Sequence, residues 1–77
     1  MHHPPPDWAQ ARLHALGDRL RACRHAAHLT QWQLGERIGR DHKTISRWEN
    51  AHRIPSALDL IYIAHALGIP LAELVGE

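Results

Sequence analysis

Basic side chains gather in the middle of this 77-residue chain, and the chemistry they offer is the binding of anions. Between positions 19 and 53 eight basic and three acidic residues give a net charge of +5, whereas the whole chain carries +1. The basic residues are Arg19, Arg21, Arg24, Arg37, Arg40, Lys43, Arg47 and Arg53. Such a distribution suits a domain that turns one face toward phosphate groups. Ordinary solubilising charge explains it equally well, so charge alone does not decide.

Metal binding and catalysis find less support. Among the eight histidines, His25 and His28 are three residues apart, but no Cys, Asp or Glu joins them at the spacing of a zinc site. Cys23 stands alone and falls in an apolar helical stripe, which indicates a buried, inert thiol. The chain has no glycine-rich nucleophile turn and no phosphate loop. We therefore expect no metal, no cofactor and no enzymatic activity.

The elements that position these side chains are predicted to be helices. Ala and Leu dominate, and strand-favouring residues are scarce. A first helix is expected from about residue 7 to residue 27 with Asp7 as its N-cap, because the apolar residues Leu13, Leu16, Leu20, Cys23 and Ala27 recur every three or four positions. Residues 1–6, which contain three consecutive prolines, are expected to form a disordered arm in front of one domain spanning residues 7–77.

Four shorter helices are expected to follow. Thr30 and Asp41 are suitable N-caps for the first two of them, and Ser56 suits the N-cap or the first turn of the third. Gly39 suits the left-handed position that ends the first. Pro70 opens the last. The predicted inner face of the helix after Ser56 consists of Ala57, Leu60, Ile61, Ala64 and Leu67. No apolar run approaches the roughly 18 residues of a membrane span, and no signal-peptide core is present, so a cytoplasmic protein without a membrane partner is expected.

The segment from Gln31 to Asn50 meets the requirements of two short helices joined by a tight turn. Gly35 supplies a small residue where the helices cross, and Gly39 supplies the turn. The inward positions of the pair are apolar, namely Leu34, Ile38, Ile45 and Trp48. The outward face of the second helix is polar or basic, with His42, Lys43, Thr44 and Arg47.

With its flanks, this segment resembles the Cro/C1-type (XRE-like) helix-turn-helix family of phage and bacterial regulators. The resemblance covers roughly Leu16 to Val75. It is carried by Leu29-Thr30-Gln31, Leu34-Gly35, Ile38-Gly39, Ile45-Ser46-Arg47-Trp48-Glu49-Asn50, Pro55-Ser56 and Ile63-Ala64-His65-Ala66-Leu67-Gly68. It implies an all-α, five-helix, lambda-repressor-like bundle whose helices 2 and 3 form the helix-turn-helix. The implied function is a transcriptional regulator that binds double-stranded DNA sequence-specifically.

The resemblance also implies roles for the matching positions. The helix at about 42–49 is expected in the major groove, where His42, Lys43, Thr44 and Arg47 are the base-reading set. An arginine such as Arg47 can bind guanine O6 and N7 together. The implied phosphate contacts are Gln31, Arg40, Asn50 and Arg53, with Arg37 as a weaker candidate. Arg24 and Glu49 match a structural ion pair between helix 1 and the end of helix 3.

A few positions depart from the family pattern. Gly35 stands where alanine is more common, and Trp32 stands where the family usually has an exposed polar residue. Leu58 and Tyr62 fall off the predicted core face of their helix, so these residues and Trp32 form either a partner surface or part of a wider core. Leu71 and Leu74 of the last helix are expected at a homodimer or partner surface. The alternative function is therefore a protein-interaction module, such as an antitoxin of a toxin–antitoxin pair.

Overall fold

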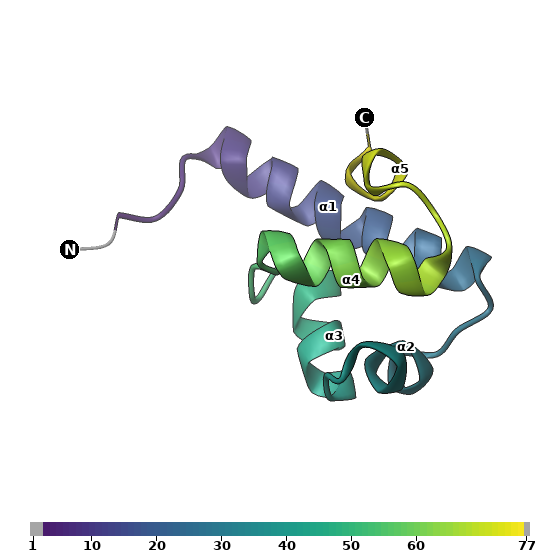
Figure 1. The fold of residues 1–77 in the computed structure, drawn as a ribbon. Helices are drawn as coiled ribbons and strands as arrows, with labels where there is room; N and C mark the ends of the chain where they lie inside the picture. The colour runs from purple at the N-terminus through teal and green to yellow at the C-terminus, as the bar shows by residue number, and fades with distance from the viewer. Residues whose placement is uncertain (1–2, 77) are drawn as a thin grey trace.

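The computed structural model describes residues 3–76 and contains five helices in the predicted order (Figure 1). They are α1 (Asp7–Ala26), α2 (Gln31–Ile38), α3 (His42–Glu49), α4 (Ala57–Leu67) and α5 (Leu71–Val75). Residues 3–76 contain no strand, so the expected all-α, five-helix class is confirmed. Residues 1 and 2 of the predicted arm, and residue 77, lie outside the described range.

Side-chain caps set the starts of the three middle helices. The Thr30 hydroxyl accepts a hydrogen bond from the Gln33 amide, and the Gln33 side chain accepts one from the Thr30 amide. Ser56 and Asp59 repeat this reciprocal arrangement at the start of α4. The Asp41 carboxylate accepts from the amides of Lys43 and Thr44 at the start of α3. The three predicted N-caps are confirmed, because the chemistry of a cap is local.

The start of α1 differs from the prediction. Asp7 is the first helical residue and not the N-cap, and its side chain makes no capping hydrogen bond. Pro6 holds the cap position, and its carbonyl accepts from the amides of Ala9 and Gln10. A proline has the extended backbone that an N-cap requires, so the helix begins without a side-chain acceptor.

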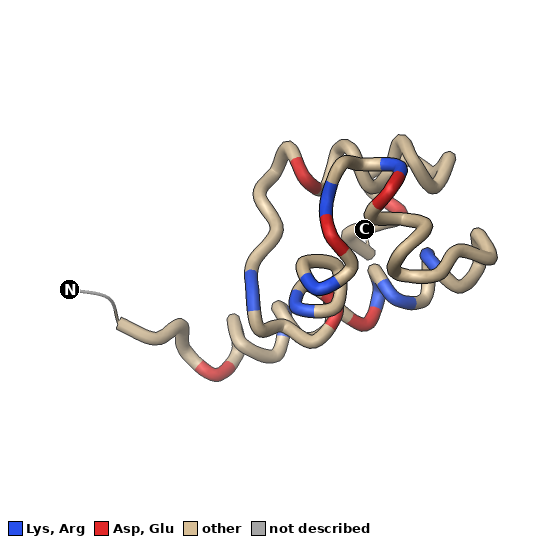
Figure 2. Tube along the Cα trace, turned by 90° about the horizontal axis from the view of Figure 1, so that it is seen from below, with Lys and Arg blue, Asp and Glu red and all other residues tan. Residues whose placement is uncertain are grey.

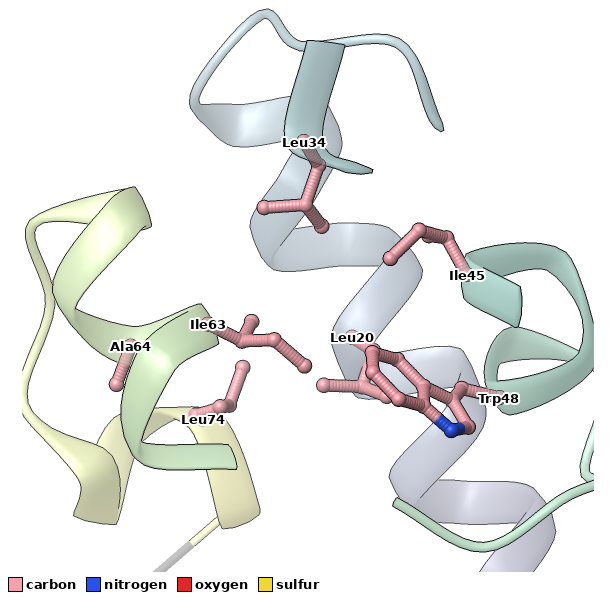
Figure 3. Close-up of a cluster of buried hydrophobic side chains, with 7 residues drawn as sticks. All are labelled: Leu20, Leu34, Ile45, Trp48, Ile63, Ala64 and Leu74. Carbon is pink, nitrogen blue, oxygen red and sulfur yellow. The ribbon is translucent and has the colours of Figure 1, made fainter. Parts of the chain in front are cut away.

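Seven buried side chains from all five helices form one core, in which they point toward one another (Figure 3). They are Leu20, Leu34, Ile45, Trp48, Ile63, Ala64 and Leu74. Cys23, partly buried, packs against this cluster. In the described part of the chain, no helix combines the length and the apolar character needed to cross a membrane.

Helix α4 turns only part of its predicted inner face to this core. Ala64 is buried and Leu60 and Leu67 pack against the core, as predicted. Ala57 and Ile61 are exposed, with Ile61 at 51%, and Ile63, outside the predicted set, is buried in their place. Leu58 and Tyr62 are exposed as well, so they do not belong to a wider core. The helix is apolar on nearly every side, and periodicity therefore does not define which side faces inward.

The predicted outward position of Leu74 is wrong. Leu74 is the most completely buried apolar residue of the described chain, with 0% of its surface exposed. Helix α5 packs against both α1 and α4, and Leu74 is its residue that enters the core between them. Leu71 and Val75 of the same helix remain exposed, as a partner surface on α5 requires.

Two glycines allow the backbones around α3 to approach closely. A Cβ atom at Gly17 of α1 would lie 2.5 Å from the carbonyl oxygen of Glu49, at the end of α3. A Cβ atom at Gly35 of α2 would meet the carbonyl oxygen of Arg40, in the turn before α3. These contacts leave no room for a methyl group, and they fix how deeply α3 sits against α1 and α2.

Candidate nucleic-acid interface

Helix α3 is anchored by one face and free on the other. Ile45, Trp48 and Glu49 are buried, whereas Lys43 and Arg47 are exposed. His42 and Thr44, the other two predicted base-reading residues, are half-buried. Neither the Lys43 ammonium nor the Arg47 guanidinium has a hydrogen-bonding or ion-pairing partner among residues 3–76. The helix thus presents two basic groups that are free to bind a ligand.

The same side of the molecule carries further basic residues. Figure 2 looks at the fold from the side on which α2 and α3 lie, and it shows Lys and Arg positions along α3 and in the neighbouring segments. Acidic positions occur on this side too. Asp41, the N-cap of α3, has its pKa held below the usual value by the hydrogen bonds from the Thr44 and Lys43 amides. Asp41 is therefore ionised and engaged with the start of α3.

A buried ion pair holds the other end of α3. The Arg24 guanidinium donates to both oxygens of the Glu49 carboxylate, at 2.7 Å from Nε and 3.0 Å from Nη2. Its Nη1 donates to the carbonyl oxygen of Leu29 at 2.8 Å, just before α2. Arg21 adds a longer contact of 3.5 Å to Glu49. Arg24 thereby joins α1, the α1–α2 loop and the end of α3, the structural position that the family resemblance implies.

The pKa of Glu49 reflects two opposing effects. Burial alone would raise it, because desolvation penalises the charged carboxylate. Hydrogen bonds from Arg24 and Gln31, together with the positive charges of Arg24 and Arg21, outweigh that effect. The pKa of Glu49 therefore lies below its ordinary value, and the carboxylate is charged inside the fold.

The predicted phosphate-binding residues fall into two groups. Arg53 is exposed and has no side-chain partner among residues 3–76. The others already make contacts within the protein: Gln31 Nε2 donates to Glu49 at 3.1 Å, and Arg40 Nη2 donates to Asp59 at 2.7 Å. Asn50 Nδ2 donates to the Ser46 carbonyl at 2.8 Å, and Asn50 Oδ1 accepts from Arg21. These three residues thus serve the fold as well as any ligand.

Arg37, the weaker phosphate candidate, is directed toward α4. Its Nη1 donates to the carbonyl oxygen of Ala66 at 3.3 Å. The contact ties α2 to α4, whereas the free basic groups lie on α3 and in the loop that follows. We therefore leave Arg37 out of the candidate interface.

One contact at this interface is not among those that the sequence predicts. The indole of Trp32, near the start of α2, stacks on the imidazole of His42, the first residue of α3. The ring centroids are 3.6 Å apart and the ring planes differ by 16°. Trp32 is nevertheless 68% exposed, so it is not a core residue. Nothing in the sequence pairs these two positions, because the contact depends on the angle between two helices.

The remaining titratable groups form no further site. Within the described range, no three His, Cys, Asp or Glu side chains gather as metal ligands would. Several exposed apolar residues lie on α4 and α5, namely Leu58, Ile61, Tyr62, Leu71 and Val75.

Comparison with known proteins gives a consistent picture. A family model for a helix-turn-helix domain matches residues 15–75. A search of the curated proteins finds no match. Among solved structures, the restriction-modification controller protein C.AhdI from Aeromonas hydrophila shares 34% sequence identity with this chain. The alignment covers 83% of this chain and 97% of that one, with a TM-score of 0.80.

Two further structures are similar. The clp gene regulator ClgR from C. glutamicum is 28% identical over 83% of each chain, with a TM-score of 0.78. The P22 c2 repressor, solved in complex with a synthetic operator, is 30% identical over 77% of this chain and 89% of that one, with a TM-score of 0.70. The family model spans most of the sequence, and the five helices and capped turn agree with it, so this chain belongs to the Cro/C1-type helix-turn-helix family.

Proposed function

We propose that this protein is a transcriptional regulator that binds double-stranded DNA sequence-specifically through α3. The observation that carries the proposal is the free basic face of α3, which bears Lys43 and Arg47, opposite a face fixed in the core by Ile45 and Trp48. An α-helix fits the major groove of B-DNA, and a rigidly held helix presents its side chains to base edges in a defined register. The similarity to the P22 c2 repressor, which was solved in complex with a synthetic operator, supports this role.

Base reading is assigned to four residues of α3. Arg47 is suited to guanine, whose O6 and N7 it can bind with two hydrogen bonds, and Lys43 can donate to the same acceptors as a point charge. Thr44 offers a hydroxyl, or a methyl group to thymine. His42 offers a donor or an acceptor according to its tautomer. All four lie on α3, and Lys43 and Arg47 are exposed.

Phosphate binding is assigned first to Arg53 and to the start of α2. The amides of Gln31 and Trp32 open that helix and have no acceptor among residues 3–76, so they are available to an anion. Gln31, Arg40 and Asn50 can add contacts, but each must share its side chain with Glu49, Asp59 or Ser46. Phosphate contacts fix the position on the duplex, whereas base contacts supply the specificity.

Selection of binding sites from random duplexes, at a fixed salt concentration, tests the function. Wild-type protein should enrich one sequence, and Arg47→Ala should lose about 1–3 kcal/mol of discrimination at the base pair that Arg47 reads. Arg12→Ala is the matched control, because it removes the same charge from an exposed position on α1. If the wild type enriches no sequence, the regulator function is wrong. If Arg47→Ala enriches the wild-type sequence unchanged, the assignment of Arg47 is wrong.

We further propose a homodimer on a two-fold operator. The exposed apolar side chains of α4 and α5, among them Leu58, Tyr62 and Leu71, favour a second copy of the chain as the occupant of this surface. A two-fold dimer would place its recognition helices about 34 Å apart, which is one turn of DNA. The similar structures are a controller, a gene regulator and a repressor, which supports this function in preference to an antitoxin.

A further inference from the structure

The stack between Trp32 and His42 joins the two helices of the helix-turn-helix at the candidate interface. Their ring centroids are 3.6 Å apart and nearly parallel, at 16°. Trp32 lies beside Gln31 at the start of α2, and His42 lies beside Lys43 at the start of α3. The stack therefore occupies the same edge of the molecule as the groups assigned to phosphate and base.

The exposure of Trp32 needs a reason. A large apolar ring that is 68% exposed gains little from burial in the free protein. The other strongly exposed tryptophan, Trp8, is 71% exposed on α1 and stacks on no ring among residues 3–76. What distinguishes Trp32 is its one ring partner, and that partner is a polar side chain in the base-reading set.

A stacked imidazole has fewer orientations than a free one. The indole covers one face of the His42 ring, so the ring plane is held and the two nitrogens lie at its edge. Those nitrogens are the hydrogen-bonding groups of histidine. A side chain that is already ordered loses less conformational entropy when it binds, and it discriminates better between partners of different geometry.

We propose that Trp32 is a positioning residue that holds the His42 imidazole in the orientation in which it reads one base pair. The proposal rests on the DNA-binding function proposed above. The chemistry assigned to His42 is donation from a ring N–H to the N7 or O6 acceptor of a purine in the major groove. Specificity at that base pair is then shared by two helices, since α3 supplies the reading group and α2 holds it.

The test compares base preferences rather than overall affinity. Affinity is measured for the selected duplex and for duplexes with single base-pair changes, at one salt concentration. The proteins compared are the wild type, Trp32→Ala, Trp32→Phe, His42→Ala and the double variant Trp32→Ala/His42→Ala. Trp32→Ala should lower the preference at one base pair of each half-site about three- to tenfold, the cost of ordering one side chain on binding. His42→Ala should affect the same base pair, and the double variant should be no worse than His42→Ala. Trp32→Phe keeps a ring and should retain most of the preference.

Two controls separate positioning from a general effect on the fold. Trp8→Ala removes an equally exposed tryptophan from α1 and should leave every base preference unchanged. In the free protein, NMR should show His42 ring protons shifted upfield by the indole, and Trp32→Ala should remove that shift while the thermal unfolding midpoint stays near the wild-type value.

The outcomes distinguish this proposal from the function on which it rests. If wild-type protein prefers no sequence, the regulator function fails. If it prefers one and Trp32→Ala keeps the whole pattern, the positioning role fails while the function stands. A uniform loss at all base pairs, or a loss at a base pair that His42→Ala does not affect, also overturns the positioning role.

Discussion

Glu49 shows how a single side chain can hold three helices. Its side chain is 1% exposed, yet it is charged, and it accepts hydrogen bonds from Arg24 of α1 and Gln31 of α2. Such a pair adds little net stability relative to an apolar core, because both charges must leave water. Removing one partner is costly, because the other charge is then left buried and uncompensated.

The pH dependence of stability should report this carboxylate. Its pKa is lower in the folded protein than its ordinary value of 4.5, so the unfolded chain binds more protons as the solution becomes acidic. Its stabilising effect is complete above about pH 4.5 and is lost as pH falls through the lower, folded-state pKa. Urea denaturation from neutral pH to about pH 3 should show this loss in the free energy of unfolding.

The variant Glu49→Gln isolates that contribution. At neutral pH its free energy of unfolding should be about 3 kcal/mol lower than that of the wild type. As the pH falls, its free energy of unfolding should decrease less steeply than that of the wild type. Some decline should remain, because the pKa values of Asp41 and Asp59 also lie below their ordinary values. Glu36→Gln, which removes an exposed carboxylate from α2, should follow the wild-type curve. Parallel curves for Glu49→Gln and wild type would show that Glu49 does not titrate as described.

At the scale of elements, the sequence predicts what is local. The caps at Thr30, Asp41 and Ser56 were predictable because each bonds to backbone within three residues of itself. Gly39 was predictable because its left-handed conformation, with φ of 71°, ends a helix at little cost only for glycine. The inward face of α4 was only partly predictable: Leu60, Ala64 and Leu67 face the core as expected, but packing against α2 and α5 buries Ile63 where Ile61 was predicted.

Helix propensity and tertiary packing disagree at Gly35 and Gly17. Alanine at either position gains about 1 kcal/mol of helix propensity. A methyl group there meets a backbone carbonyl, of Arg40 or of Glu49, and backbone cannot move aside as a flexible side chain can. We expect the cost of the clash to exceed the gain in propensity, so that the free energy of unfolding of each alanine variant is about 1–3 kcal/mol lower than that of the wild type.

Chemical denaturation of Gly35→Ala and Gly17→Ala measures this balance. His14→Ala, at an exposed position of α1, is the control for propensity and should change stability by no more than about 0.5 kcal/mol. A more stable Gly35→Ala variant would mean that the turn before α3 accommodates alanine.

At the scale of the whole molecule, the free basic groups should govern how DNA affinity depends on salt. Protein binding releases cations that are condensed on the DNA, so the affinity for B-DNA falls as salt rises. The slope of log affinity against log salt concentration is about −0.9 for each phosphate that the protein neutralises. Arg53→Ala should make that slope shallower by about 1 and weaken binding to all sequences alike. Arg12→Ala should leave the slope unchanged. An unchanged slope for Arg53→Ala would remove Arg53 from the phosphate-binding set.

The exposed apolar side of α4 and α5 should determine the oligomeric state. Sedimentation analysis should show a dimer for wild type, and Tyr62→Glu should dissociate it, because burying an unpaired carboxylate in an apolar interface is unfavourable. Trp8→Glu makes the same kind of change on α1 and should remain dimeric. A wild-type protein that stays monomeric at all concentrations would contradict the homodimer.

The candidate interface was only partly predictable from the sequence. The residues on α3 follow from one helical pattern and the family resemblance, and the structure leaves Lys43 and Arg47 free. The contacts of Trp32 with His42, and of Arg40 with Asp59, join residues on different segments, and no local rule connects them. The close approach of α1 to the end of α3 could have been predicted from Gly17, because a glycine within a long helix usually has a packing reason.

The burial of Leu74 links the stability of the fold to self-association. Helix α5 has five residues, too few to persist alone, and Leu74 is its buried attachment to the core. The same helix turns Leu71 and Val75 outward, where the second copy is proposed to sit. Shortening the Leu74 side chain would therefore loosen the attachment of α5, which carries Leu71 and Val75, as well as the core. Lower stability and weaker self-association would then appear together in one variant.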